Sequence, residues 1–598
     1  MSDWITNDSP RLWRFGGSDF YGDEILAAAD THSDAALQPI AADGFTGFWL
    51  RGRLRELART SLFPELGDAK VQARLRSLQT LIARARPHGL GLYLFFNDPL
   101  ALRATDPFWK AHPDLAGQPF RDFGGEEVVS LCLSTPSGKR WFEEAVESVL
   151  EALPGLGGVI LITASEHHSH CWSHQALRGL DDGITEVATA PLTCARCRDR
   201  EPADLVAQLV KTWSDASKRR SDPPNVIAWN WSWSMWYEDP QREVIERLPD
   251  GVTVMADWER GGQRPWRGRS LLVDEYSLGY AGPSERFLGS SRVARGRNLP
   301  VMAKLQLGAT HELATVPNLP LMLSLHAKLA GMWEHGVSGF MGCWNFGCSH
   351  TLNTHAIRYF LERPELDAST FLEGLAASYF GEVETPRLLR AWRLFGEAFA
   401  AYPFSIRMLY WSPMNDAPAV PLTFRYEARP LGGSWMVHEQ GDRLEDCLPP
   451  FSIEEAISSF GTMRERWAKG VNDYAEALGG SDASDERFRR NRREELSTAG
   501  MVLCHLQAME NISRFHGWRG MAMKRHGLKP PCDLPPDREA LGLVSSQIEV
   551  AGRALELVRE DDRLGWHQEC HARFCSEGVL SAAIRTMSDV CQSSSFAP

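Results

Sequence analysis

The sequence lacks a run of apolar residues that could cross a membrane: no stretch of its 598 residues approaches the roughly 18 uninterrupted apolar residues that a spanning helix needs. Its beginning, MSDWITNDSPRLWRF, also lacks the basic and apolar regions of a secretory signal, so we expect a cytoplasmic protein. A formal net charge of −13 disfavours the basic surface that nucleic acid or an anionic membrane binds. We therefore expect neither as a partner, and leave a homo-oligomer open.

Motifs of several enzyme classes are missing as well. No GxGxxG follows an early strand, and the strand ends carry no phosphate cradle, no Schiff-base lysine within an apolar strand and no Gly-x-Ser-x-Gly elbow. The chain has 12 cysteines, which in the absence of a signal are expected to be reduced thiols or metal ligands rather than disulfides.

Short β-branched runs alternate with helix-period stretches over residues 1–362, whereas residues 363–598 show helix-period patterns joined by Pro- and Gly-rich connections. This organisation predicts an α/β fold class: a (β/α)8 TIM barrel followed by a mainly α-helical C-terminal domain. Nine candidate strands compete for eight places. No helix separates GVTVMAD from SLLVDEY, so one of these two, or the first strand, is expected outside the barrel. A doubly wound sheet is the alternative.

Carboxylates, amides and indoles follow the predicted strands, where barrel enzymes place their active sites. Two carboxylates flanking an acetal are what glycoside hydrolysis needs. Glu166, after the apolar run VILITA, is the predicted general acid because apolar surroundings raise a carboxyl pKa. Glu275 is the first choice for its partner and Glu312 the second. For each of the three, a structural hydrogen bond at the barrel rim is the alternative role.

The 21 tryptophans include several beside Asn, Asp or Gly at strand ends, and an indole offers the apolar face and single donor that suit a sugar ring. We predict that further strand-end side chains bind a carbohydrate substrate. They are Asn97, His167, His168, Trp229, Asn230, Trp231, Asp257, Tyr276, Gln306, His311, Trp344 and Asn345.

The segments LITASEHHSHCWSH, CARC, DEYSLGYAGPSERF, AKLQLGATHEL, GFMGCWNFG and AWRLFGEAFAAYPF resemble a group of bacterial glycoside-hydrolase-like proteins, similar in layout to glycoside hydrolase family 20. The resemblance covers most of the barrel. It implies that Glu166 is the acid, that Trp344 is the indole under a sugar subsite, and that the activity resembles that of an exo-acting β-N-acetylhexosaminidase. Family 20 has an Asp directly before the acid, where this chain has Ser165. A mechanism that uses Glu275 or Glu312 is therefore as well supported as substrate-assisted cleavage.

Cysteines and histidines gather after Glu166. Cys171 precedes Cys194 and Cys197, which form a C-x-x-C pair, so a structural zinc ion is predicted beside the alternative of thiols without a metal. The fourth ligand would be His168, His170, His174 or the distant Cys132. The HExxH spacing of a catalytic zinc is missing, and we expect that catalysis requires no cofactor.

Two other functions remain open at this point. One is a carbohydrate-binding protein that has kept the barrel and lost turnover. The other is a metal-dependent hydrolase or lyase built on the His and Cys cluster.

Overall fold

The computed structural model describes residues 9–122, 124–165, 167–173, 175, 192–437, 439–479 and 485–594. The chain forms two compact units. The first contains residues 1–261, 283–305 and 332–342, and the second contains residues 262–282, 306–331 and 343–598. The predicted boundary between residues 362 and 363 lies where alternating strand and helix patterns give way to helix-period patterns alone. It stays a prediction.

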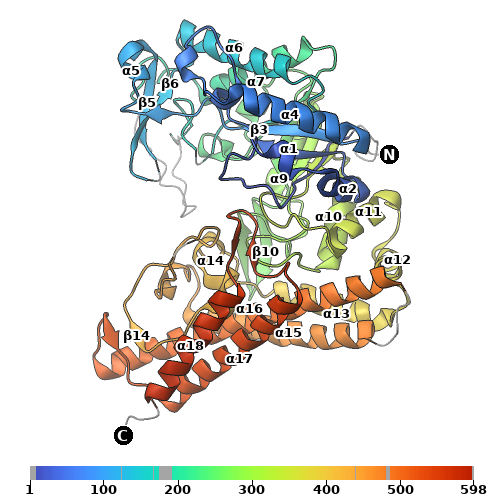
Figure 1. Ribbon diagram of the computed structural model, residues 1–598, viewed down its shortest axis with the longest axis vertical. Coiled ribbons are helices and arrows are strands. Elements are labelled where there is room, and N and C mark those ends of the chain that lie inside the picture. The colour runs from blue at the N-terminus through green and yellow to red at the C-terminus, as the bar shows by residue number, and fades with distance from the viewer. Residues whose placement is uncertain are drawn as a thin grey trace. The chain divides into compact units, whose positions relative to one another are not determined.

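The first unit contains a closed barrel of parallel strands, which confirms the predicted fold class (Figure 1). Each strand is short and largely apolar, as expected for strands buried on both faces. In spatial order around the barrel the strands are β1 (Arg11–Trp13), β13 (Gly339–Met341), β12 (Val301–Lys304), β9 (Thr253–Asp257), β8 (Asn225–Trp229), β7 (Gly158–Ile162), β3 (Gly91–Phe96) and β2 (Gly47–Arg51).

The ambiguity over the ninth candidate strand is resolved by pairing. The run SLLVDEY contributes β11 (Arg269–Val273), which pairs antiparallel with β10 (Gly262–Trp266) in a hairpin outside the barrel. Its exposure alternates between adjacent residues, unlike that of the barrel strands. Both the first strand and GVTVMAD belong to the barrel.

Amphipathic helices connect the barrel strands. Helix α4 packs on β3, α7 on β8 and α9 on β9. The start of α6 shows how the sequence sets a boundary: the Thr135 hydroxyl accepts a hydrogen bond from the Gly138 amide, and Pro136 occupies the first turn. Helices that lie wholly in this unit are α1 (Ala28–Thr31), α2 (Asp34–Ala42), α3 (Leu54–Leu57), α4 (Val71–Ala85), α5 (Phe108–Ala111), α6 (Pro136–Ala152), α7 (Pro202–Lys218), α8 (Arg242–Ile245) and α9 (Glu285–Gly296).

A small antiparallel sheet follows the third barrel strand. Its order is β4 (Leu102–Arg103), β6 (Glu127–Leu131) and β5 (Ala116–Arg121). The carboxyl end of β6 leads to Cys132, which is fully buried.

Long helices dominate the second unit. Helices α13, α15, α16, α17 and α18 pack against one another in succession (Figure 1). The buried residues of α13, α15 and α17 are mainly apolar, as expected for the packed face of an amphipathic helix. The helices of this unit are α11 (Leu352–Glu362), α12 (Ala368–Phe380), α13 (Thr385–Phe399), α14 (Ile406–Trp411), α15 (Ile453–Gly479), α16 (Glu486–His526), α17 (Arg538–Glu560) and α18 (Glu577–Ser594). Helix α10 spans Met322–Glu334. Two short antiparallel pairs join β14 (Arg425–Tyr426) to β15 (Cys532–Asp533), and β16 (Trp566–His567) to β17 (Ala572–Arg573).

Among the helices of the described chain, none is both long enough and apolar enough to span a membrane.

A carboxyl group is buried between helices of the second unit. Glu495 of α16 is 1% exposed and accepts hydrogen bonds from Asn318 Nδ2 at 3.2 Å and from the Tyr474 hydroxyl at 3.2 Å. Burial raises the pKa of Glu495 from 4.5 to about 7. The folded protein therefore retains this proton more tightly than the unfolded chain does.

The stability of the protein should consequently fall as the pH rises through this range, because ionisation of Glu495 is penalised only in the folded state. We expect Glu495→Gln to remove this component, so that the variant exceeds the wild type by about 3 kcal/mol in apparent unfolding free energy at pH 8. Near pH 4 the two proteins should be similarly stable. Urea unfolding at both pH values measures the difference, and Glu556→Gln on an exposed position of α17 is the control. A constant difference between Glu495→Gln and the wild type would contradict the assignment.

Candidate functional site

The chain that follows the fourth barrel strand, β7, is anchored on both sides of the predicted acid. Ser165 Oγ accepts hydrogen bonds from Asn97 Nδ2 at 3.2 Å and from the His167 amide at 3.1 Å. The His167 ring nitrogen Nε2 lies 3.2 Å from Arg51 Nη2 at the end of β2. The His168 carbonyl accepts from the Ala101 amide at 2.9 Å. Glu166 itself lies outside the described residues, as does His174.

A buried carboxylate ends the sixth barrel strand, β9. Asp257 is 3% exposed, and its Oδ1 accepts a hydrogen bond from the Trp229 indole at 3.0 Å. Burial raises the pKa of Asp257 above its ordinary value, against the opposing charge of Arg260, whose Nη1 lies 3.5 Å from Oδ2. The strand ends β8 and β9 are thereby joined through a polar contact at the rim of the barrel.

Lys304, the last residue of β12, is fully buried, and its Nζ donates to the Leu305 carbonyl at 3.1 Å. Its Nζ also lies 5.9 Å from the centre of the Trp229 ring. No Schiff-base lysine within an apolar strand was predicted from the sequence, and Lys304, a buried lysine at the end of such a strand, was not considered. The polar neighbours at the rim, Asp257 and the Trp229 ring, explain how a cation is tolerated there.

Two indoles at the end of β8, Trp229 as its last residue and Trp231 just after it, differ in their surroundings. Trp229 is 1% exposed and belongs to the core, whereas Trp231 is half-buried. One face of the Trp231 ring is covered by the Arg260 guanidinium, 4.2 Å from the ring centre. Asn230 between them is buried, and its Nδ2 lies 3.5 Å from Gln241 Oε1. Of these three, Trp231 has the surface that a sugar ring could contact.

In the second unit, Glu275 follows strand β11 and is 2% exposed. Its Oε2 accepts a hydrogen bond from the Tyr410 hydroxyl at 2.6 Å, and its Oε1 accepts one from the Tyr276 amide at 2.9 Å. Tyr410 belongs to α14 and packs edge-on against His311 and Trp435. The carboxylate is therefore held in one orientation by a phenol from a distant helix.

Glu312 has a different environment. It is fully buried and accepts hydrogen bonds from Ser277 Oγ at 2.7 Å, Thr310 Oγ1 at 2.9 Å and the amides of Leu278 at 2.9 Å and Gly279 at 3.2 Å. Both carboxylate oxygens are thus occupied by donors from two loops. This arrangement favours the structural alternative for Glu312, because little accepting capacity is left for a substrate.

The remaining predicted residues of the second unit also form hydrogen bonds. Gln306 Oε1 accepts from the Trp344 amide at 2.8 Å, and Asn345 Nδ2 donates to Glu569 Oε1 at 3.1 Å. His311 packs on Phe346, with ring centres 4.4 Å apart. Residues near the C-terminus therefore fix the loop that carries Trp344.

Burial separates the predicted substrate-binding residues into two sets. Four side chains are half-buried and present surface directly: His167, His168, Trp231 and Trp344. The others are buried: Asn97, Trp229, Asn230, Asp257, Tyr276, Gln306, His311 and Asn345.

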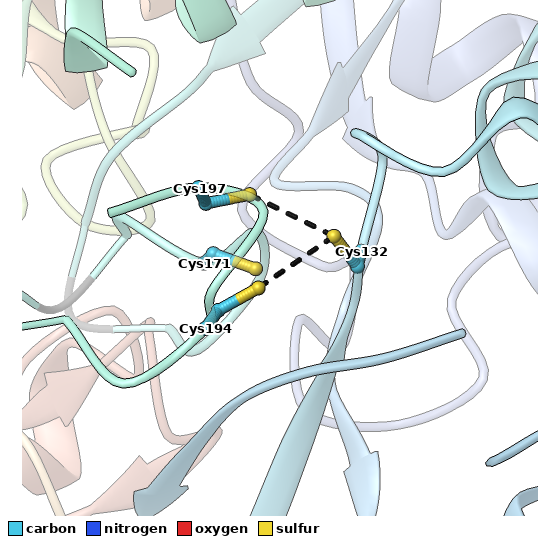
Figure 2. Close-up of side chains that lie close together, drawn as sticks. All are labelled: Cys132, Cys171, Cys194 and Cys197. Carbon is cyan, nitrogen blue, oxygen red and sulfur yellow. Dashed lines mark hydrogen bonds between the residues drawn. The ribbon is translucent and has the colours of Figure 1, made fainter. Parts of the chain in front are cut away.

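The predicted metal ligands Cys171, Cys194 and Cys197 lie together, and the structure brings Cys132 to them (Figure 2). His170, one of the alternative fourth ligands, instead has its Nε2 2.5 Å from the Thr163 carbonyl oxygen. His168 packs against Phe120, with ring centres 5.0 Å apart.

Several contributing residues were missed by the sequence analysis. Tyr410 and Glu569 come from the helical part of the chain, far in sequence from Glu275 and Asn345, and their residue types alone gave no signal. A strand-terminal lysine in VMAKLQL and an arginine shortly after Asp257 were visible signals for Lys304 and Arg260.

Comparison with known proteins gives matches at the level of structure only. No family model and no curated protein sequence matches this chain. A GH138 enzyme targeting pectin rhamnogalacturonan II is 10% identical with a TM-score of 0.49, over 92% of this chain and 62% of its own length. A GH5-4 broad specificity endoglucanase from Clostridium acetobutylicum is 11% identical with a TM-score of 0.33, over 57% of this chain and 89% of its own length. A GH20 exo β-N-acetylglucosaminidase from Vibrio harveyi is 10% identical with a TM-score of 0.32, over 61% of this chain and 54% of its own length.

This chain therefore spans less than two thirds of the length of the GH138 enzyme. The barrel assignment itself rests on the strand pairing described above.

Proposed function

We propose that this protein is a glycoside hydrolase that uses two carboxylates, with Glu166 as general acid and Glu275 as the second group. The observation that carries the proposal is the setting of Glu275. Its carboxylate is buried and is oriented by the Tyr410 hydroxyl at 2.6 Å. A neutral donor fixes and stabilises an ionised carboxylate, which is the form that acts as nucleophile or base.

The position of Glu166 in the sequence supports its role as the acid. Active sites of such barrels form at the carboxyl ends of the strands, and Glu166 follows the fourth strand within four residues. Its neighbours Ser165 and His167 are anchored to Asn97 and Arg51. A general acid needs this kind of support, because proton transfer requires its donor within hydrogen-bonding distance of the leaving oxygen.

The carbohydrate would contact the half-buried side chains first. In the first unit, Trp231 offers ring surface to the apolar face of a sugar, and the imidazoles of His167 and His168 can hydrogen-bond to hydroxyl groups. In the second unit, Trp344 offers a ring surface of its own. Asp257 acts indirectly in this proposal, since its Oδ1 is taken by the Trp229 indole.

Ser165 bears on the choice of mechanism. Its hydroxyl accepts from Asn97 and from the His167 amide, and it carries no negative charge with which to stabilise a developing oxazolinium ion. This favours the mechanism that uses Glu275 over substrate-assisted cleavage of an N-acetylhexosaminide.

A panel of aryl glycosides tests the proposal, with N-acetylhexosaminides, hexosides and uronides in both anomeric forms and oligosaccharides of each class. We expect release of the aryl alcohol or a shortened glycan from one class, which would name the sugar. No cleavage of any member, together with a sugar-dependent rise in melting temperature, would overturn the proposal in favour of a carbohydrate-binding protein without turnover.

A further inference from the structure

We propose that Cys132, Cys171, Cys194 and Cys197 bind one structural zinc ion. The four sulfur atoms all lie within 4.8 Å of one another, and all four residues are at most 6% exposed. Cys132 follows β6, Cys171 lies in the segment after β7, and the other two precede α7. Figure 2 shows the four side chains converging on one point between these segments.

The separations between the sulfur atoms fit a tetrahedral tetrathiolate. Zinc–sulfur bonds of about 2.3 Å place the corners of a tetrahedron about 3.8 Å apart. The Sγ of Cys132 lies 3.7 Å from that of Cys194 and 3.7 Å from that of Cys197. A disulfide would need a separation of about 2.05 Å, so these two pairs are not bonded.

The surroundings of the sulfurs also suit a metal–thiolate centre, which carries a net negative charge when four thiolates bind a divalent ion. Arg196 Nε lies 3.3 Å from Cys132 Sγ, and the hydroxyls of Ser130 and Ser134 lie 3.3 Å and 3.1 Å from Cys171 Sγ and Cys197 Sγ. Such donors stabilise thiolates and orient them.

The ligand set points to a structural ion rather than a catalytic one. Four thiolates occupy all four coordination positions of a tetrahedral zinc ion, whereas a catalytic zinc ion keeps one position for water or substrate. The proposal thus removes the support for a metal-dependent hydrolase at this cluster. Iron accepts the same four ligands, and an elemental analysis of the purified protein distinguishes iron from zinc.

The ion would add a common link between three segments that hydrogen bonds already join, among them one from Arg200 Nη1 to Ser134 Oγ at 2.6 Å. Cys171 stands five residues beyond Glu166 in the sequence, so its ligation would fix a point of the chain close to the proposed acid. Local contacts shape the same segment: the Ser169 amide donates to Ser173 Oγ at 2.8 Å, and the Trp172 indole donates to the Cys197 carbonyl at 3.2 Å. This positioning role rests on the proposed function, whereas zinc binding does not.

Metal analysis of the purified 598-residue protein tests the binding itself. We expect one zinc per chain, and a markedly lower content in Cys171→Ser and Cys194→Ser. Cys447→Ser is the matched control, because Cys447 is a buried thiol outside the cluster and donates to the Leu444 carbonyl, as a serine also can. The control should retain its zinc.

A second measurement uses the wild-type protein, in case the variants do not fold. Growth in cobalt should give the visible absorption of tetrahedral tetrathiolate cobalt, and zinc should displace it. Four thiols that titrate without a chelator in a metal-free folded protein would overturn the proposal. So would a disulfide within the cluster, or iron in the native protein. Each result is independent of whether any glycoside is cleaved.

Discussion

Replacing Glu166 by glutamine is expected to lower kcat/KM for an aryl glycoside with a poor leaving group by about 10³-fold, because a positioned general acid contributes roughly 10²- to 10⁴-fold. Glutamine keeps the size of the side chain and removes its transferable proton. The loss should be far smaller for a dinitrophenyl glycoside, whose leaving group departs without protonation. Initial rates on the two substrates measure this difference.

The pattern across leaving groups separates an acid from a merely structural residue. A residue that only supports the fold would lower both rates by the same factor. Circular dichroism and sugar-dependent melting should match the wild type in Glu166→Gln. Full activity of Glu166→Gln on the glycoside with the poor leaving group would contradict the assignment of Glu166 as the general acid.

Glu275→Gln is expected to lower turnover of both kinds of substrate by at least about 10³-fold, because the second carboxylate acts whatever the leaving group. The change is nearly isosteric, and the amide oxygen can still accept from Tyr410. Tyr410→Phe should reduce kcat by roughly 10- to 100-fold, the range for losing a hydrogen bond to a charged group. Steady-state kinetics on the dinitrophenyl glycoside measures both.

Glu312→Gln provides the contrast with Glu275→Gln. The amide nitrogen of the new glutamine would face N–H and O–H donors that now bind the Glu312 carboxylate, and it cannot accept hydrogen bonds from them. The melting temperature should therefore drop, while the folded protein keeps its kcat. Azide added to Glu275→Ala should form a glycosyl azide of inverted configuration if Glu275 is the nucleophile. The partner assignment would be lost if Glu312→Gln, rather than Glu275→Gln, abolished turnover.

The barrel and the helical region could be predicted because they depend on local patterns. Buried parallel strands are short apolar runs, and the helices show a period of 3.6 residues. The choice between GVTVMAD and SLLVDEY could not be made from the sequence, since both are short runs, and their different pairing partners and burial are set by the fold. Register between strands is a property of the closed sheet.

The candidate site was harder to predict because its support comes from distant parts of the chain. Glu275 is oriented by Tyr410, and Glu312 is held by Ser277 across 35 residues. A sequence pattern identifies a carboxylate after a strand, but it does not reveal whether its oxygens are already occupied. The C-x-x-C pair was a local signal, whereas the place of Cys132 beside it depends on the fold.

The chain path described for the two units has a consequence for how the protein can be made and divided. Residues 262–282 and 306–331 belong to the second unit, yet they are flanked on both sides by segments of the first. During synthesis on the ribosome these two segments emerge before most of the helices of the second unit. They can therefore pack in their own unit only after those helices have been synthesised. No single cleavage point releases either unit whole. The two units therefore have to be expressed as one chain, unlike domains that follow each other in sequence, which can be produced separately.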